Sequence, residues 1–224
     1  MNKIELFPAL LSTFNYDNHD VFKQTYLEHA NKYVINDLTG EAEGVNLVHH
    51  NPAFADFYAW VASCSKQYLE ELNINLDKMN IVMAKSWLSF VDADREVPFH
   101  SHADHHLSFI YYVNAPAGCD YINFGDPRGA NLNEPFHGAF EKTFDNIIEY
   151  NRYNSRNHYF PANEGQLWIF PSKMNHWTTR FTEFEGVRQA IAGDLLLIYN
   201  DINNKTPFGM YSQEYWKFYD PKAL

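Results

Sequence analysis

From residue 80 onward, the chain consists of short apolar segments separated by turn residues, and this pattern restricts the fold more than any other feature. Within the segments the residue character changes with a period of two, which is typical of β-strands. Gly118, Gly165 and Pro171 are among the turn residues between them. Many short strands with such turn signals predict a β-sandwich or jelly roll. The predicted strands are residues 81–91, 107–114, 121–124, 157–161, 166–170, 177–181 and 188–200.

Two helices are predicted ahead of the strands. In residues 18–34, Phe22, Tyr26 and Tyr33 recur at helical spacing. A longer apolar stripe runs through residues 53–73, and such a stripe packs a helix against a sheet. We therefore expect a mainly β fold with flanking α-helices.

Composition excludes several kinds of partner. The formal net charge is −11, whereas affinity for nucleic acids and for anionic membrane surfaces rests on Lys and Arg. No stretch approaches the ~18 apolar residues of a membrane span, and the N-terminus lacks the pattern of a signal peptide. Cys64 and Cys119 are too few for a disulfide scaffold. We expect a cytoplasmic protein with reduced cysteines and no nucleic-acid or membrane partner, and a homodimer is left open.

Histidines gather in residues 100–106, directly before a predicted strand. Imidazole and carboxylate are the ligands of the 2-His-1-carboxylate triad that holds Fe(II) and leaves other coordination positions open. In extended chain, residues two apart point to the same side. His102-x-Asp104 satisfies this spacing, and so does His100-x-His102.

Another candidate histidine and an arginine follow later in the chain. His176 ends the pattern G-x-L-x-x-F-P-S-x-x-x-H that begins at Gly165, and Arg188 follows twelve residues later. An arginine that points into a barrel needs an anion, and its guanidinium forms a bidentate fork with a carboxylate. We expect Arg188 on a strand beside the one that carries His176, facing the same cavity.

This ordered set resembles the 2-oxoglutarate/Fe(II) dioxygenases, in particular a branch of putative oxygenases related in fold to prolyl hydroxylases. The resemblance spans most of the chain and is densest from residue 85 to 198. Its further elements are Glu5-Leu6-Phe7-Pro8, Ser86-Trp87, Leu107-Ser108-x-x-Tyr111-Tyr112-Val113, and Phe124-Gly125-Asp126-Pro127-Arg128.

The resemblance implies one oxygenase domain over residues 1–224 with a double-stranded β-helix, a cupin-like jelly roll. Its helical part would span about 1–78, its jelly-roll core about 79–200, and a C-terminal extension 201–224. It implies that Fe(II), 2-oxoglutarate and O2 together oxidise a small molecule, an amino acid or a peptide side chain, usually by hydroxylation.

The resemblance also assigns residues. The iron ligands would be His102, Asp104 and His176. Because this branch is marked by H-x-H, His100 is an alternative ligand. Arg188 would bind the distal carboxylate of 2-oxoglutarate with help from Tyr111 or Tyr112, of which a strand can turn only one inward.

Two other functions compete with this interpretation. One is a cupin-like metal enzyme that does not use 2-oxoglutarate, such as a three-His dioxygenase, and the other is a non-catalytic jelly-roll binding domain. Arg188 separates the first from the oxygenase, because that chemistry needs no carboxylate clamp there. The binding domain has no reason to keep an intact facial triad. The long polar segment 126–157 is predicted to be a lid over the site.

Overall fold

The computed structural model describes residues 2, 8–33, 46–92, 94–125, 149, 151–153, 155, 157–180, 183–200 and 215–224. The strands are β1 Ser12–Asn15, β2 Met79–Val91, β3 Leu107–Asn114, β4 Tyr121–Gly125, β5 Asn157–Pro161, β6 Gln166–Pro171, β7 Asn175–Thr179, β8 Arg188–Tyr199 and β9 Lys217–Tyr219. The α-helices are α1 His19–His29 and α2 Ala55–Glu71, and short 3₁₀ turns cover Ala30–Tyr33, Val48–His50, Pro52–Phe54 and Leu76–Lys78. Most of the predicted lid lies outside the described residues.

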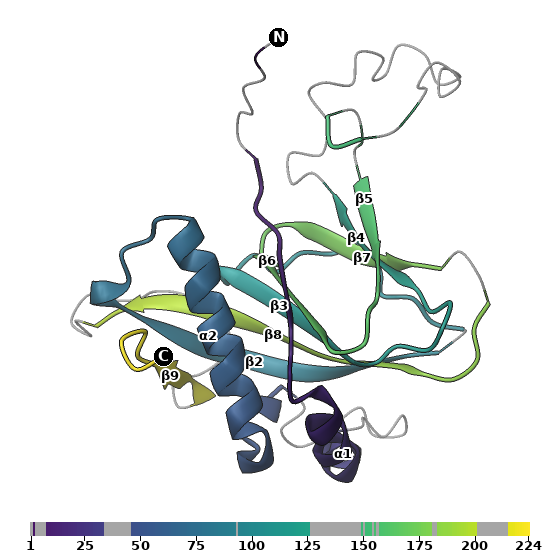
Figure 1. The fold of residues 1–224 in the computed structure, drawn as a ribbon, viewed down its shortest axis with the longest axis horizontal. Helices are drawn as coiled ribbons and strands as arrows, with labels where there is room; N and C mark the ends of the chain where they lie inside the picture. The colour runs from purple at the N-terminus through teal and green to yellow at the C-terminus, as the bar shows by residue number, and fades with distance from the viewer. Residues whose placement is uncertain are drawn as a thin grey trace.

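The strands form two sheets, as a jelly roll requires. The larger sheet has the order β1-β6-β3-β8-β2-β9 and the smaller one β5-β4-β7, with antiparallel pairing throughout. Figure 1 shows α2 lying across the larger sheet, with β4, β5 and β7 set apart at one end. This arrangement confirms the mainly β fold with flanking helices.

Strand alternation divides β3 between two cores. Phe109 and Tyr111 point toward the helices, where they join the aromatic side chains of α1 and α2. Tyr112 points the other way, into a cluster with side chains of β4 and β6. The interior between the sheets is therefore lined by alternate residues of each strand, which explains why β3 has almost no polar positions.

A β-bulge in β2 decides which side chains reach that interior. The pairing with β8 runs Met83↔Leu195 and then Lys85↔Asp194, so Ala84 is the extra residue. Met83 belongs to the helix-side core, and a one-residue insertion moves the following side chains to the opposite face. The bulge thus turns Lys85 and Trp87 toward the space between the sheets.

Candidate metal and co-substrate site

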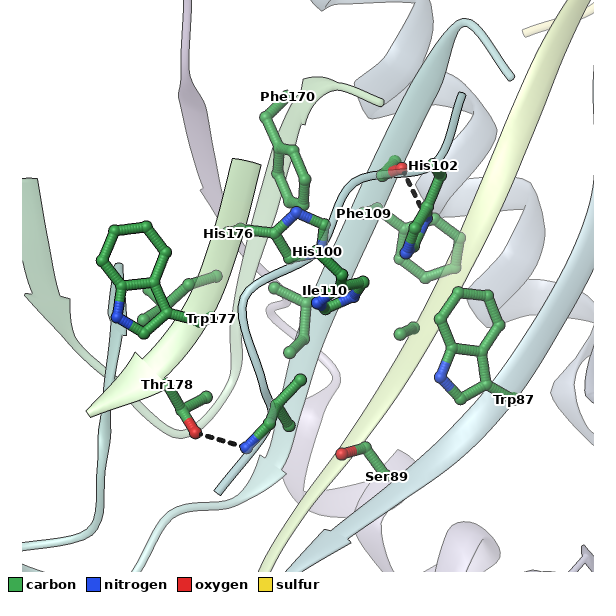
Figure 2. A pocket seen from close by; sticks show the side chains of 14 residues that line it. Trp87, Ser89, His100, His102, Phe109, Ile110, Phe170, His176, Trp177 and Thr178 are labelled. Carbon is green, nitrogen blue, oxygen red and sulfur yellow. Dashed lines mark hydrogen bonds between the residues drawn. The ribbon is translucent and has the colours of Figure 1, made fainter. Parts of the chain in front are cut away.

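Three imidazoles meet in the space between the sheets. His100 and His102 come from the loop before β3, and His176 comes from β7. One ring nitrogen from each lies within 4.8 Å of the others. Figure 2 shows the three rings converging, with Trp87 across the pocket from them. All three side chains are buried or half-buried.

The backbone explains why these histidines meet. His100 and His176 form an isolated antiparallel bridge, with N···O distances of 3.1 and 2.9 Å. The His102 amide donates to the carbonyl of Ser172 at 2.8 Å. The chain from His100 to His102 is therefore held extended along β7, so both side chains point to the same side.

Asp104 does not join this cluster. Residues 103 and 104 form a turn, and the Asp104 side chain is exposed. The two-residue spacing argument needs extended chain, and the structure supplies it for His100-x-His102 and not for His102-x-Asp104. The choice between His100 and Asp104 as an iron ligand stays a prediction.

Each imidazole of the cluster donates its Nδ1–H to an oxygen. The acceptors are the carbonyl of Pro98 for His100 at 2.7 Å, Asp194 Oδ1 for His102 at 2.6 Å, and the carbonyl of Met174 for His176 at 3.0 Å. Because carbonyls and carboxylates only accept, Nδ1 carries the proton in each ring. The Nε2 lone pairs are then left for a metal, with the outer-shell hydrogen bonds that metal-bound histidines usually have.

Burial favours the neutral form of two of these imidazoles, those of His100 and His176. Burial lowers the pKa of His176 to about 4, against a weaker opposing hydrogen bond to Met174, and it also lowers the pKa of His100. Neutral imidazole is the form that binds metal ions. The residues present therefore fit a metal ion.

Behind His102 lies a buried carboxylate. Asp194 in β8 is fully buried; its Oδ1 accepts from His102 and, at 2.5 Å, from the Ser108 hydroxyl. Lys85 Nζ forms an ion pair with Oδ2 at 2.9 Å. Burial would raise the pKa of Asp194, yet the bonds and charges of His102, Lys85 and Ser108 lower it to about 2. Asp194 is thus a carboxylate at neutral pH.

The sequence interpretation missed Asp194 as a site residue. A signal was present, because an aspartate within the apolar strand 190–198 must have a charged or hydrogen-bonding partner. The partner itself, 92 residues earlier in the chain, could not be named without the fold.

Apolar and aromatic side chains form most of the pocket wall beside the cluster. Trp87 lies 5.6 Å from the His102 ring, and Phe170 lies 4.9 Å from the His176 ring, measured between centroids. Both sheets contribute to the wall. Besides the histidines, the lining residues are Trp87, Ser89, Val97, Ser108, Phe109, Ile110, Ile122, Phe170, Trp177, Thr178 and Ala192.

Arg188 is fully buried at the start of β8, outside the set of residues that line this pocket. Its Nε lies 3.2 Å from Asp120 Oδ1, and its Cζ lies 5.5 Å from the centre of the Tyr112 ring. In the part of the chain that the structure describes, neither the guanidinium nitrogens nor the Tyr112 hydroxyl have a hydrogen-bond partner. These orphaned donors fit a carboxylate ligand.

The two tyrosines separate as strand alternation predicts. Tyr112 faces Arg188 between the sheets, whereas Tyr111 packs on the helix side, where its hydroxyl lies 2.7 Å from His19 Nδ1.

The expectation that Arg188 lies on a strand beside that of His176 was wrong. Its strand, β8, lies between β3 and β2 in the larger sheet, whereas His176 is on β7 in the smaller sheet. The two residues belong to facing sheets and not to neighbouring strands.

Acid should destabilise the metal-free protein well before its carboxylates titrate. Burial lowers the pKa of His49 to about 4, as it does for His176. Below pH 6.5 the unfolded chain therefore binds more protons than the folded chain. The free energy of unfolding falls with pH, by roughly 2 kcal/mol per histidine between pH 6.5 and 5. Urea unfolding across this range measures the loss. His49→Gln should flatten the pH slope and His50→Gln, at an exposed position, should not; equal slopes would contradict the assignment.

The double-stranded β-helix and its histidine cluster fit the class of non-haem iron enzymes. Residues 85–194, which include the cluster, Asp194 and Arg188, match the model of a family described as putative 2OG-Fe(II) oxygenase. The chain belongs to the 2-oxoglutarate/Fe(II) oxygenases and is an oxidoreductase that uses Fe(II), 2-oxoglutarate and O2. No curated protein matches it.

Solved structures show the same fold at low sequence identity. The epimerase SnoN in complex with Fe3+, α-ketoglutarate and nogalamycin RO has a TM-score of 0.53 at 11% identity, over 94% of this chain and 94% of that one. A Pseudomonas putida prolyl-4-hydroxylase has a TM-score of 0.52 at 12% identity, over 84% and 88%. HygX from Streptomyces hygroscopicus, with nickel and 2-oxoglutarate bound, has a TM-score of 0.50 at 10% identity, over 84% and 81%.

No described helix is long and apolar enough to cross a membrane. Both cysteines are free and buried.

Proposed function

We propose that this oxygenase holds Fe(II) through the imidazoles of His100, His102 and His176 and oxidises a small molecule or a peptide side chain, usually by hydroxylation. The observation that carries the proposal is the shared orientation of the three rings, whose Nδ1–H groups all face oxygen acceptors. This orientation leaves three Nε2 atoms for one ion, in a cluster whose nitrogens lie within 4.8 Å.

The proposed co-substrate clamp is Arg188 with Tyr112. Both side chains are fully buried and face each other between the sheets, with donors that lack hydrogen-bond partners among the described residues. A buried guanidinium without enough acceptors is costly, and a carboxylate of 2-oxoglutarate would satisfy it. Asp120 offsets part of the charge of Arg188 in the absence of the co-substrate.

Held by His100, His102 and His176, Fe(II) would supply the redox chemistry by which O2 oxidises the substrate while 2-oxoglutarate is converted to succinate and CO2. The protein orients the reactants and keeps water away from them. Pro98, Met174 and Asp194 fix the ring orientations, and Trp87 and Phe170 supply apolar walls next to the cluster.

The substrate should present an apolar or aromatic group to this wall. Ser89 and Thr178 are the uncharged polar groups available to orient it on the side away from Asp194. The related structures include a prolyl-4-hydroxylase and an epimerase bound to nogalamycin RO, so the fold accommodates more than one kind of substrate. A single domain over residues 1–224, a cytoplasmic location and a homodimer stay predictions.

Three histidines are also the ligand set of the competing three-His enzyme that does not use 2-oxoglutarate. The observation against that alternative is the buried Arg188–Tyr112 pair, whose donors find no acceptor in the part of the chain that the structure describes. A non-catalytic binding domain has no need for either feature.

Thermal stability measured without oxygen tests the proposal. A ligand that binds the folded state at a hundred times its Kd stabilises it by about 2.7 kcal/mol. For a chain of this size, this corresponds to roughly 5–10 °C in Tm. We expect Fe(II) to raise Tm and 2-oxoglutarate to raise it further. Glutarate, which lacks the keto group, is the control and should add less. If 2-oxoglutarate adds nothing to Fe(II) alone, the three-His alternative replaces the proposal.

A further inference from the structure

We propose that Asp194 is a positioning residue that supplies, through His102, the negative charge that a three-imidazole iron site lacks. This inference rests on the proposed function. In a 2-His-1-carboxylate triad, the carboxylate binds the metal directly. Here an imidazole stands in that place, and a carboxylate stands immediately behind it.

The contact between Asp194 and His102 is short and shielded from water. Asp194 Oδ1 lies 2.6 Å from His102 Nδ1, and the Asp194 side chain is fully buried. His100 and His176 donate to backbone carbonyls instead. Among the three ligands, His102 alone has an anionic hydrogen-bond acceptor, and it is therefore the ligand whose basicity is raised most.

A buried carboxylate at this position is unfavourable unless other groups compensate its charge. Its neighbours on the inner face of β8, Ala190 and Ala192, are small and apolar. Removing a carboxylate from water costs several kcal/mol unless partners compensate it. Three groups do so: His102, Ser108 and Lys85.

Lys85 limits how strongly the Asp194 charge increases the electron donation of His102 to the metal. Its ammonium lies 2.9 Å from Asp194 Oδ2 and draws the charge away from His102. The bulge at Ala84 is what places Lys85 opposite Asp194, because without the extra residue its side chain would point toward the helices. The carboxylate therefore has His102 and Ser108 on Oδ1 and the Lys85 ammonium on Oδ2, with His105 Nδ1 at 3.7 Å from Oδ2.

Substitutions at Asp194 and at Lys85 are expected to change the metal affinity in opposite directions. Asp194→Asn keeps the shape and an acceptor for His102 but removes the charge. We expect it to weaken binding of Co(II), used as the spectroscopic probe for Fe(II), by about 10–100-fold. Lys85→Met frees the carboxylate charge, and we expect it to tighten binding by about three- to tenfold. A network that only holds His102 in place would lose affinity in both variants.

The measurement is an anaerobic Co(II) titration against a competing chelator, together with the visible absorption bands of the bound ion. The bands should shift in Asp194→Asn because the donor strength of His102 changes. Circular dichroism establishes that each variant is folded. The exposed pair Asp77 and Lys222, 3.9 Å apart, offers matched controls. Asp77→Asn and Lys222→Met make the same charge changes away from the site and should leave the affinity unchanged.

Each outcome decides a separate question. Absence of Co(II) binding in the unchanged protein overturns the proposed iron site itself. Normal binding there, with an unchanged affinity in Asp194→Asn or a weakened one in Lys85→Met, overturns only the role of Asp194. If Asp194→Asn does not fold, the sign of the change in Lys85→Met still decides.

Discussion

Alanine at His100 is expected to lower Fe(II) affinity by at least about a hundredfold and to abolish oxidation, whereas Asp104→Ala should change neither. The loss of a ligand should exceed the 10–100-fold cost typical of outer-shell partners. His100 lies in the cluster with His102 and His176, and Asp104 is exposed on the turn that follows. His102→Ala and His176→Ala should behave like His100→Ala.

Anaerobic metal titration and succinate release measure the two effects separately. Asp104→Ala is the matched control for the loop, because it truncates a side chain two residues past a ligand. The opposite pattern, with metal binding lost in Asp104→Ala and kept in His100→Ala, would assign iron to His102, Asp104 and His176. The turn at residues 103–104 would then have to rearrange when the metal binds.

The strands that the sequence predicted best include β3, which is buried on both faces, and β5, of which every second residue is exposed. The predicted bounds of β3 and β5 agree with the structure, and those of β8 differ by one residue. β7 begins at Asn175 and not at Trp177, because its first residues pair with β4. The short edge strands β1 and β9 were missed, since Ser12–Asn15 and Lys217–Tyr219 are too short to show a period.

The sequence predicted the part of the site that depends on local spacing and missed the part that depends on strand pairing. The histidines were visible because ligand types and spacing are local properties of the sequence. Which pair faces inward depends on local backbone shape, and the turn at residues 103–104 favours His100 over Asp104. The roles of Asp194 and Lys85 depend on the pairing of β2 with β8 and on a bulge, which no local pattern reveals.

Arg188 should control the affinity for 2-oxoglutarate and not the affinity for iron. Its guanidinium and the Tyr112 hydroxyl have no hydrogen-bond partner within the described residues. Hydrogen bonds to charged groups contribute about 1.5–3 kcal/mol each. Since ~1.4 kcal/mol is a factor of ten, loss of Arg188 should raise the Kd for 2-oxoglutarate at least about tenfold. Calorimetric titration of 2-oxoglutarate into the anaerobic Fe(II) protein measures this change.

The design must account for Asp120, because removing one member of a buried ion pair costs about 3–5 kcal/mol. The double change Arg188→Met with Asp120→Asn removes both charges and isolates the clamp. Arg188→Lys should recover part of the affinity, since an ammonium cannot form a bidentate fork.

Asp120→Asn alone is the sharpest arm of this experiment. It leaves Arg188 buried with its full charge, and among the described residues no other carboxylate is paired with it. The carboxylate of 2-oxoglutarate then becomes the anion that Arg188 can bind. We expect 2-oxoglutarate to bind this variant at least as tightly as the unchanged protein. An unchanged titration in the double variant would place the clamp elsewhere. Arg180 is the next candidate, because its Nε also lacks a partner among the described residues. Weaker binding in Asp120→Asn would instead mean that the carboxylate is needed to hold the guanidinium in its binding orientation.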